Sequence, residues 1–382
     1  MNTKKILVRT STVPSSLAVF CYEQIVRLSA EYDVHIITSS GPELELLKKI
    51  PGVTVHIVEM QRHISPIKDI KCVFQMYRLL RKIKPDIIHS VTPKAGLVSM
   101  LAAKIAGVKY RVHTFTGLIW PTSMGIKRTI LKNVDKLLCL CATNIVPESF
   151  SVKKAMEDGK ITSKPLNVLG SGNLRGIDID YFSPQAHFDT PKIPNIKFCT
   201  FVFVGRIVSD KGVNELIAAF DRLTKKYDDV SLLLVGPEEQ SLDPLSQETL
   251  KTISQNKDII SIGAVTDVRP YLTASKALIL PSYREGLPNA VIEAGAMELP
   301  CIVSDIPSCK ELIQDGYNGI VTRVRSSDDL YDAMQQIRNN ISEAKQMGIN
   351  ARHNVINKYD KEKVYAALTT LYNQLCPSCQ DL

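Results

Sequence analysis

Two segments in the second half of the chain place charged residues where a nucleotide diphosphate could bind. In the first, the strand-like stretch 201–204 runs into Gly205 and Arg206, and Lys211 follows five positions after the arginine. An arginine can bind a phosphate through two parallel hydrogen bonds and a lysine adds a point charge, so this spacing before a helix suits a diphosphate. A solvated basic turn is the alternative interpretation of this segment alone.

The second segment, residues 281–294, contains two carboxylates, Glu285 and Glu293. We expect Glu285 in the loop after a strand and Glu293 about one turn inside the next helix. The N-terminus of that helix offers free N–H groups to an anion, and Pro288, which has no N–H, fits its first turn. Carboxylates beside an anion site can accept hydrogen bonds from hydroxyls, Glu293 from a ribose and Glu285 from a sugar. Taken alone, the segment also fits a helix with an acidic first turn.

The elements that position these residues alternate between short apolar strands and amphipathic helices, which is typical of parallel α/β sheets. We expect strands at 6–8, 34–37, 53–58, 87–89, 110–113 and 143–146 in the first half, and at 199–204, 231–235, 259–262, 277–280 and 301–304 in the second. The clearest helices are predicted at 68–82, 96–106, 212–227, 289–297 and 361–375.

The turn-rich stretch 170–196 predicts a connection between two Rossmann-like domains. Ligands bind such sheets at the carboxyl ends of the strands, so we expect two domains that face each other across a cleft. The predicted boundaries are 1–175 for the first domain and 176–357 for the second. The remaining segment, 358–382, is expected to form a helix that packs back toward the first domain.

Composition restricts the class of protein further. The 382 residues are 45% hydrophobic and 23% charged, which excludes a disordered or fibrous chain. The start of the chain, with Arg9 where a signal peptide needs apolar residues, predicts a first strand of a cytosolic protein. Nine cysteines without a secretion signal indicate reduced thiols. Because the dinucleotide-binding, P-loop and hydrolase glycine motifs are missing from the sequence, those three classes lose their main support.

The net charge of +8 is divided unevenly, with +14 in residues 1–175 and −6 in residues 176–382. Part of the basic excess lies on two predicted helices: Arg128, Lys132 and Lys136 recur on one face, and residues 68–84 hold six lysines and arginines. Such faces are either solvated or bind anionic lipid. Nucleic acid fits poorly as a partner, because no recognised binding module accompanies the charge.

In order and spacing, residues 205–212, 234–238 and 282–294 resemble the donor half of the retaining glycosyltransferases of family 4. Residues 62–66, 92–96, 113–117 and 170–178 resemble a bacterial branch of that family that builds capsule, O-antigen or other lipid-linked surface polysaccharides. The resemblance covers essentially the whole chain and implies the glycosyltransferase-B fold of two Rossmann-like domains. It implies transfer of an N-acetylhexosamine or hexose from a nucleotide sugar, expected to be a UDP-sugar, to a polyprenyl-diphosphate-linked saccharide. The expected location is the inner face of the cytoplasmic membrane.

The resemblance also implies roles for individual residues. The expected catalytic set is His113, beside the donor sugar, with Arg206 and Lys211 on the diphosphate and Glu285 on the sugar. Further donor contacts are expected from the ribose-binding Glu293 and from the backbone around Gly205, Gly286, Leu287, Asn289 and Ala290. Lys94 and Arg62 are expected on the acceptor side.

Two departures from the family pattern affect these expectations. The segment 11–16 after the first strand lacks the glycines that many relatives have there, so its contact with donor phosphate is in doubt. Gly286, Leu287 and Pro288 replace the commoner residues after the first glutamate, which shifts the expected backbone donors toward Asn289 and Ala290.

No metal and no cofactor is expected, because the two cations and a helix N-terminus can neutralise the leaving diphosphate. Asp178 and Asp180 match a metal-binding D-x-D pattern, but they lie far in sequence from the diphosphate loop, and we interpret them as structural. Two alternatives remain at this point. One is a nucleotide-sugar epimerase of the same fold, and the other is a non-catalytic, membrane-associated protein that binds a sugar nucleotide.

Overall fold

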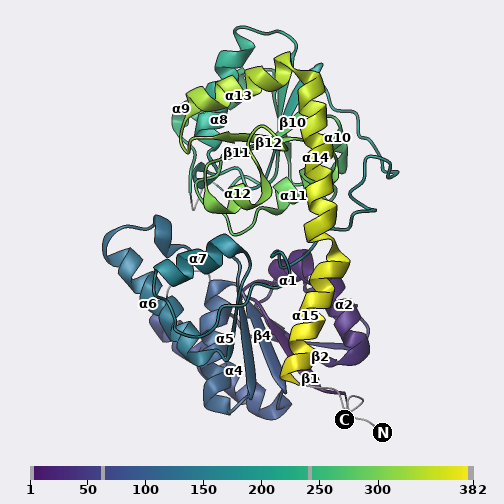
Figure 1. The fold of residues 1–382 in the computed structure, drawn as a ribbon. Helices are drawn as coiled ribbons and strands as arrows, with labels where there is room; N and C mark the ends of the chain where they lie inside the picture. Colours follow the sequence, from purple (N-terminus) through teal and green to yellow (C-terminus); the bar gives the residue numbers. More distant parts are fainter. Residues whose placement is uncertain (1–3, 62–64, 240–242, 377–382) are drawn as a thin grey trace. The chain divides into compact units, whose positions relative to one another are not determined.

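The computed structural model describes residues 4–61, 65–239 and 243–376 and divides the chain into two compact units. The first unit consists of Met1–Gly176 and Glu362–Leu382, and the second of Ile177–Lys361. Each is a parallel sheet with helices packed against it (Figure 1). The predicted α/β class with two Rossmann-like sheets is therefore confirmed.

In the first unit, six parallel strands lie in the order β3-β2-β1-β4-β5-β6. Their bounds are β1 Ile6–Thr10, β2 Asp33–Thr38, β3 Val53–Ile57, β4 Ile87–Val91, β5 Tyr110–Phe115 and β6 Asn144–Pro147. The helices are α1 Pro14–Phe20, α2 Tyr22–Glu31, α3 Leu44–Lys48, α4 Pro66–Ile83, α5 Pro93–Ala106, η1 Trp120–Thr122, α6 Gly125–Cys141 and α7 Phe150–Asp158, with α15 Lys361–Leu375.

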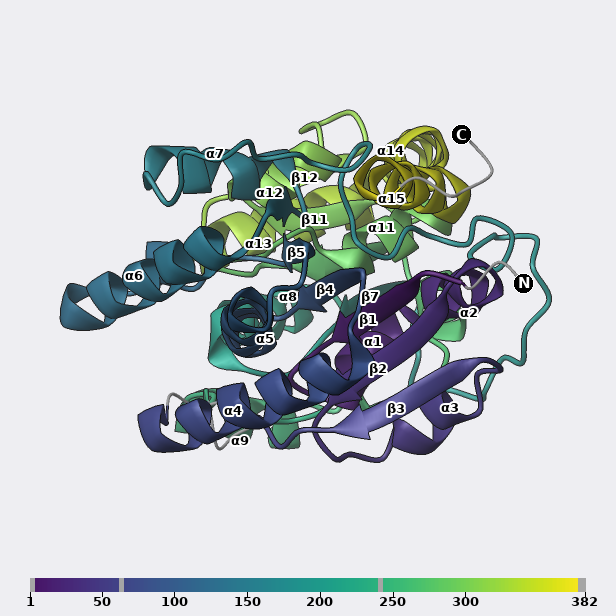
Figure 2. The same cartoon turned by 90° about the horizontal axis from the view of Figure 1, so that it is seen from below.

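Side chains alternate between two cores on opposite faces of this sheet. Val8 and Ile88 pack with α4, α5 and α6, whereas their neighbours Leu7 and Ile87 pack with α2 and α15. Figure 2 shows α5 between α4 and α6 on the first of these faces. On the other face, Tyr372 of α15 is fully buried, so the C-terminal helix completes the core of the first unit.

The second unit repeats this plan with strands in the order β12-β11-β10-β7-β8-β9. Their bounds are β7 Cys199–Val204, β8 Val230–Val235, β9 Ile259–Gly263, β10 Ala277–Leu280, β11 Cys301–Ser304 and β12 Gly319–Thr322. The helices are η2 Ser209–Lys211, α8 Val213–Thr224, α9 Gln247–Gln255, α10 Arg269–Thr273, α11 Asn289–Ala296, α12 Pro307–Leu312, α13 Ser327–Asn339 and α14 Ile341–Tyr359.

Every predicted strand has a counterpart, and the differences lie at the ends of elements. The helix expected from 96 begins at Pro93, since a proline is well suited to a first helical position. The helix expected from 212 begins at Val213, because Gly212 has a left-handed backbone that caps it. The edge strand β12 was not predicted. None of the helices in the described part of the chain combines the length and the hydropathy that a membrane span requires.

Candidate functional site

The strands β7 and β10 are neighbours in the second sheet, so the loops after them meet at its carboxyl edge. The backbone N–H of Tyr283 donates to the carbonyl of Asp210, and Arg284 pairs with the Asp210 carboxylate at 2.7 Å. The loop after β8 joins them, because Asp210 N–H donates to the Asp243 carboxylate at 2.6 Å. Three loops from three adjacent strands are thus tied into one rigid edge.

This edge brings together two of the predicted site residues. Lys211 Nζ lies 2.5 Å from Glu285 Oε1, and both side chains are mostly buried. Arg206 stands in the same loop as Lys211, but its guanidinium pairs with Glu239 at 2.8 Å and is 43% exposed. An ammonium has three donors, so Lys211 can hold Glu285 and still donate to an anion. The structure therefore presents one fixed cation and one more accessible cation beside a carboxylate.

Two glycines permit this close packing of loops. A Cβ on Gly212, whose φ is 71°, would lie 2.1 Å from the carbonyl oxygen of Pro281. A Cβ on Gly236, with φ 144°, would lie 1.8 Å from the carbonyl oxygen of Gly205. Since neither approach leaves room for a side chain, glycine is required at both positions.

The remaining predicted donor residues lie between Glu285 and α11. Gly286, Asn289 and Ala290 are partly buried, whereas the Leu287 side chain belongs to the hydrophobic core, so only its backbone is available to a ligand. Glu293 is 9% exposed inside α11. The roles of these residues in donor binding stay predictions.

One residue of this edge, Ser282, belongs to the segment 282–294 but has no predicted role. Ser282 follows β10 and is fully buried, and its hydroxyl has no hydrogen-bond partner among the described residues. A hydroxyl of this kind is a candidate donor to a bound anion. The sequence signal was present, because Ser282 lies within the segment 281–294, but only the structure reveals the unsatisfied hydroxyl.

In the first unit, His113 is buried on β5 at 1% exposure. Its Nδ1 lies 2.7 Å from the Ser90 hydroxyl, and the ring contacts Phe115 edge to face. Burial lowers the pKa of His113 to about 3, so the imidazole is neutral. A Cβ on Gly96 would lie 2.4 Å from this ring, which shows how tightly α5 covers it. The predicted place beside the donor sugar stays a prediction, and this geometry restricts His113 to hydrogen bonding as a neutral ring.

The predicted acceptor-side residue Lys94 lies in the first turn of α5. Its ammonium pairs with Asp69 of α4 at 2.5 Å, and both side chains are largely buried. Just before it, Thr92 has φ 72°, which is a strained conformation for a β-branched residue, and its hydroxyl bonds Thr12 after β1. Lys94 therefore stands at a strained, polar carboxyl edge of the first sheet. The other predicted acceptor residue, Arg62, lies outside the described residues.

The Asp178 carboxylate has partners within the protein, and the structural interpretation of Asp178 and Asp180 stays a prediction. Asp178 Oδ1 accepts from the backbone N–H groups of Asp180 and Tyr181, and Lys361 pairs with its other oxygen at 2.5 Å. Burial opposes ionisation, yet these bonds from Lys361 and the backbone lower the pKa of Asp178. Across residues 4–61, 65–239 and 243–376, no three His, Cys, Asp or Glu side chains gather in a way that could hold a metal ion.

Comparison with known proteins decides the family. Residues 190–354 match the family described as glycosyl transferases group 1, and residues 12–149 match the glycosyl transferase 4-like family. The chain is 31% identical to the capsular polysaccharide biosynthesis glycosyltransferase CapM of Staphylococcus aureus, over 89% of this chain and 90% of that protein. The chain belongs to the family 4-like glycosyltransferases.

Other members of this glycosyltransferase family are similar over the same length. An Escherichia coli UDP-Gal:alpha-D-GlcNAc-diphosphoundecaprenol alpha-1,3-galactosyltransferase is 29% identical over 90% of this chain and 89% of its own. Two solved structures share the fold: sucrose-phosphate synthase from Thermosynechococcus elongatus, with a TM-score of 0.79 and 18% identity, and Anabaena Alr3699/HepE, with a TM-score of 0.77 and 16% identity. They cover 97% of this chain, and it covers 99% of each. The predicted glycosyltransferase-B fold and glycosyltransferase function are confirmed, and nothing favours the epimerase.

Proposed function

We propose that this glycosyltransferase transfers a sugar from a UDP-sugar to a saccharide linked to a polyprenyl diphosphate, during synthesis of a bacterial surface polysaccharide. The observation that carries the proposal is the contact between Lys211 and Glu285 at the junction of the loops after β7 and β10. This contact supports the proposal, because Lys211 can donate to a leaving diphosphate while Glu285, beside it, can accept from sugar hydroxyls. The similarity to the E. coli enzyme, whose name states a UDP donor and a diphosphoundecaprenol acceptor, supports this choice of substrates.

In this proposal the leaving UDP is stabilised by side-chain cations and no metal is needed. Lys211 keeps its bond to Glu285 and donates a second hydrogen bond to the diphosphate, while Arg206 turns from Glu239 to a phosphate. The negative charge that develops on the leaving group is then stabilised by donors that are already in place. Such electrostatic stabilisation is usually the largest single contribution to catalysis. The proposal includes retention of the anomeric configuration, with the acceptor hydroxyl attacking from the face that UDP leaves.

The test is a transfer assay with a panel of nucleotide sugars and a synthetic undecaprenyl-diphosphate saccharide as acceptor. We expect one UDP-sugar to give a product whose new linkage keeps the donor's anomeric configuration by NMR, with a rate unchanged by EDTA. Lys211→Met should abolish transfer. Lys225→Met is the matched control, because Lys225 forms an exposed ion pair with Asp221 on α8.

The outcomes separate the parts of this proposal. Transfer by Lys211→Met at the rate of Lys225→Met would refute the assignment of the site. Loss of activity with EDTA and recovery with a divalent cation would refute metal independence, and an inverted product would refute retention. Isomerisation of the nucleotide sugar without acceptor would instead support the epimerase.

We further propose that the first unit docks on an anionic membrane through α4 and α6. Both helices flank α5 (Figure 2). Large apolar side chains are exposed near their N-termini: Ile67 and Ile70 on α4, Ile126 on α6, and Met124 directly before α6. Exposed lysines and arginines adjoin these apolar residues in the sequence: Lys68, Lys71, Lys127 and Arg128. Exposed apolar residues mixed with basic ones suit the boundary between anionic headgroups and acyl chains.

Vesicle binding tests this docking surface. We expect the protein to sediment with vesicles containing phosphatidylglycerol, to remain in solution with pure phosphatidylcholine, and to lose binding as salt increases. Ile126→Glu with Ile70→Glu should abolish sedimentation. Tyr317→Glu, an exposed aromatic position of the second unit, is the control. Equal sedimentation of both variants would refute the docking surface.

A further inference from the structure

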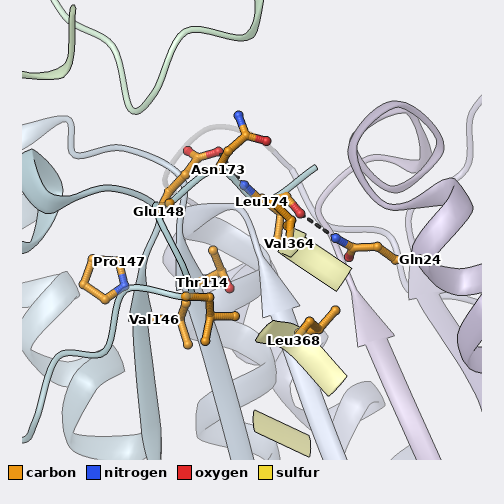
Figure 3. Close-up of a pocket in the computed structure, with 11 residues that line it drawn as sticks. Gln24, Thr114, Val146, Pro147, Glu148, Asn173, Leu174, Val364 and Leu368 are labelled. Atoms are coloured by element: carbon orange, nitrogen blue, oxygen red, sulfur yellow. Dashed lines mark hydrogen bonds between the residues drawn. The ribbon is translucent and has the colours of Figure 1, made fainter. Parts of the chain in front are cut away.

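The first unit has a small pocket at the carboxyl ends of β5 and β6. Figure 3 shows Thr114 and Leu368 toward one end of it and Glu148 and Asn173 toward the other. Its cavity volume is about 10 Å³, which is room for about one water molecule. The pocket is therefore too small for a sugar. A group of contacts in the second unit bears on the proposed transfer instead.

Tyr283, two residues before Glu285, is held at three points. Its backbone N–H donates to the carbonyl oxygen of Asp210 at 2.9 Å, and its hydroxyl donates to Glu215 Oε1 at 2.7 Å. Its ring lies under the guanidinium of Arg325, whose carbon is 4.5 Å from the ring centroid. These partners come from the loop after β7, from the first turn of α8 and from the loop after β12. Tyr283 thus joins the loop after β10 to three other segments.

The hydroxyl bond between Tyr283 and Glu215 has a fixed direction. Burial, together with the hydrogen bond to Glu215, raises the pKa of Tyr283, so the phenol keeps its proton and donates it to the carboxylate. The other carboxylate oxygen, Glu215 Oε2, is buried and has no hydrogen-bond partner among the described residues. Loss of the Tyr283 hydroxyl would therefore leave this carboxylate without a donor in the described part of the chain.

Three consecutive residues, from Tyr283 to Glu285, each bind the segment 210–215. The Arg284 side chain is 39% exposed, and an exposed ion pair contributes little to holding two loops together. A tyrosine side chain has only two rotatable torsions before its ring, so a tyrosine bonded at both its backbone and its hydroxyl is a rigid spacer. Tyr283 therefore sets the position from which Glu285 reaches Lys211.

We propose that Tyr283 and Glu215 are positioning residues for sugar transfer, whose hydrogen bond holds Glu285 beside Lys211 in the geometry that the reaction needs. In the proposed function Glu285 accepts from sugar hydroxyls and Lys211 donates to the leaving diphosphate, so a change in the spacing of these two groups lowers the rate. Tyr283 and Glu215 themselves are assigned no contact with the substrate. The inference rests on the proposed function and adds two residues that act through its site.

Steady-state kinetics with the UDP-sugar donor tests this role. Tyr283→Phe keeps the ring under Arg325 and removes only the hydroxyl. We expect kcat to fall about tenfold, the effect of one lost hydrogen bond. The KM for the donor should change by less than about twofold, because Arg206 and Lys211 still hold the diphosphate. A rise in KM with kcat unchanged would overturn the positioning role.

A conservative variant and a matched control accompany this measurement. Glu215→Gln keeps an oxygen that can accept from the Tyr283 hydroxyl, so it should retain most of the wild-type kcat, whereas Glu215→Leu should lose about as much as Tyr283→Phe. Tyr227→Phe is the control, because the ring of Tyr227 also lies under an arginine, with the guanidinium carbon of Arg338 4.0 Å from its centroid. Equal kcat values for Glu215→Gln and Glu215→Leu would overturn the inference.

A double variant separates positioning from the cost of an unpaired carboxylate. All variants are assayed at a temperature at which circular dichroism shows each to be fully folded. Tyr283→Phe combined with Glu215→Leu has no unpaired carboxylate, so it should unfold at a higher urea concentration than Tyr283→Phe. If the hydrogen bond positions Glu285, kcat stays about tenfold low in the double variant. Recovery of kcat would overturn the inference, because the loss in Tyr283→Phe would then come from the unpaired carboxylate alone.

Lys211→Met and Lys225→Met, measured in the same assay, separate this inference from the proposed function. Transfer by Tyr283→Phe at the rate of Tyr227→Phe, with Lys211→Met inactive, would overturn the positioning role and leave the proposed function intact. Transfer by Lys211→Met at the rate of Lys225→Met would refute the site itself, whatever the result for Tyr283→Phe.

Discussion

Two glycines of the second unit allow the packing of the diphosphate loop to be tested against a matched control. Gly212 and Gly316 have the same φ of 71°. A Cβ on Gly212 would lie 2.1 Å from the carbonyl oxygen of Pro281 and 2.8 Å from its carbon, whereas a Cβ on Gly316 would meet no atom within 4 Å. Gly212→Ala and Gly316→Ala therefore both place an alanine at the same left-handed φ, and only the first introduces a collision.

The two variants should therefore lose different amounts of free energy of unfolding. An alanine in the left-handed region costs about 1–2 kcal/mol, and both variants have this cost. In Gly212→Ala the loop must also move by about 1 Å to reach an ordinary contact distance, and overpacking of this kind costs a further 1–3 kcal/mol, roughly. We expect a loss in free energy of unfolding of about 1–2 kcal/mol for Gly316→Ala and about 2–5 kcal/mol for Gly212→Ala.

The displacement has a functional consequence, because Gly212 directly follows Lys211. A shift of about 1 Å in a positioning loop can reduce a rate by 10²-fold, so transfer should fall in Gly212→Ala and not in Gly316→Ala. Urea unfolding and the transfer assay measure the two effects, with the same unfolding transition compared in both variants. If Gly212→Ala matched Gly316→Ala in both measurements, the close approach to Pro281 would not be what holds the diphosphate loop.

Three further predictions concern buried charges. Glu285→Gln should leave UDP affinity equal or higher, because Lys211 is freed, while transfer falls about 10–100-fold from the lost charged hydrogen bond to the sugar; calorimetry and the transfer assay check this. Burial raises the pKa of Asp135 to about 7. Above about pH 4 the folded protein therefore keeps a proton that the unfolded chain has lost, so the free energy of unfolding must fall as the pH rises from about 4 through 7. In that pH range the wild-type free energy of unfolding should fall by roughly 1.4 kcal/mol for each pH unit, because only the folded carboxyl keeps its proton. Asp135→Asn should remove this fall, as measured by urea unfolding at several pH values. Tyr372→Phe should lower the free energy of unfolding by about 1–3 kcal/mol, because Arg9 loses a buried acceptor, whereas Arg9→Met should cost less; an equal loss in both variants would contradict the role given to Tyr372.

The charged loops at the carboxyl edge of the second sheet could be predicted because their information is local in the sequence. A buried strand followed by a turn with placed charges is visible without a structure, and it occurs twice in the second half. The contact between Lys211 and Glu285 needs one more fact, the adjacency of β7 and β10, which the rules of parallel α/β sheets favour but do not specify.

The first unit was less predictable because its decisive features depend on the direction of side chains. Sequence shows a histidine at 113 but not that it faces α5 and is enclosed by Gly96, while its neighbour Thr114 points to the opposite face of the sheet and bonds His89. Lys94 was selected for its place at a helix start, but its partner Asp69 lies on a different helix. The buried hydrogen bonds that link Arg9 to His89 run through Tyr372, near the other end of the sequence, so no local pattern could reveal them.

In the proposed function, residues 176–382 hold a diphosphate although their net charge is −6. Both cations that the proposal assigns to the donor are already paired, Arg206 with Glu239 and Lys211 with Glu285. Under that proposal the diphosphate competes with carboxylates instead of filling an empty cationic site. The more exposed Arg206 pair is the one that exchanges at little cost, since a solvated ion pair contributes about 0–1 kcal/mol. In the proposed complex the buried Lys211 pair persists and orients the ammonium. The proposal therefore predicts selectivity for a diphosphate that carries a sugar, because Glu285 stays in place to meet the sugar hydroxyls and a free diphosphate gains nothing from that carboxylate.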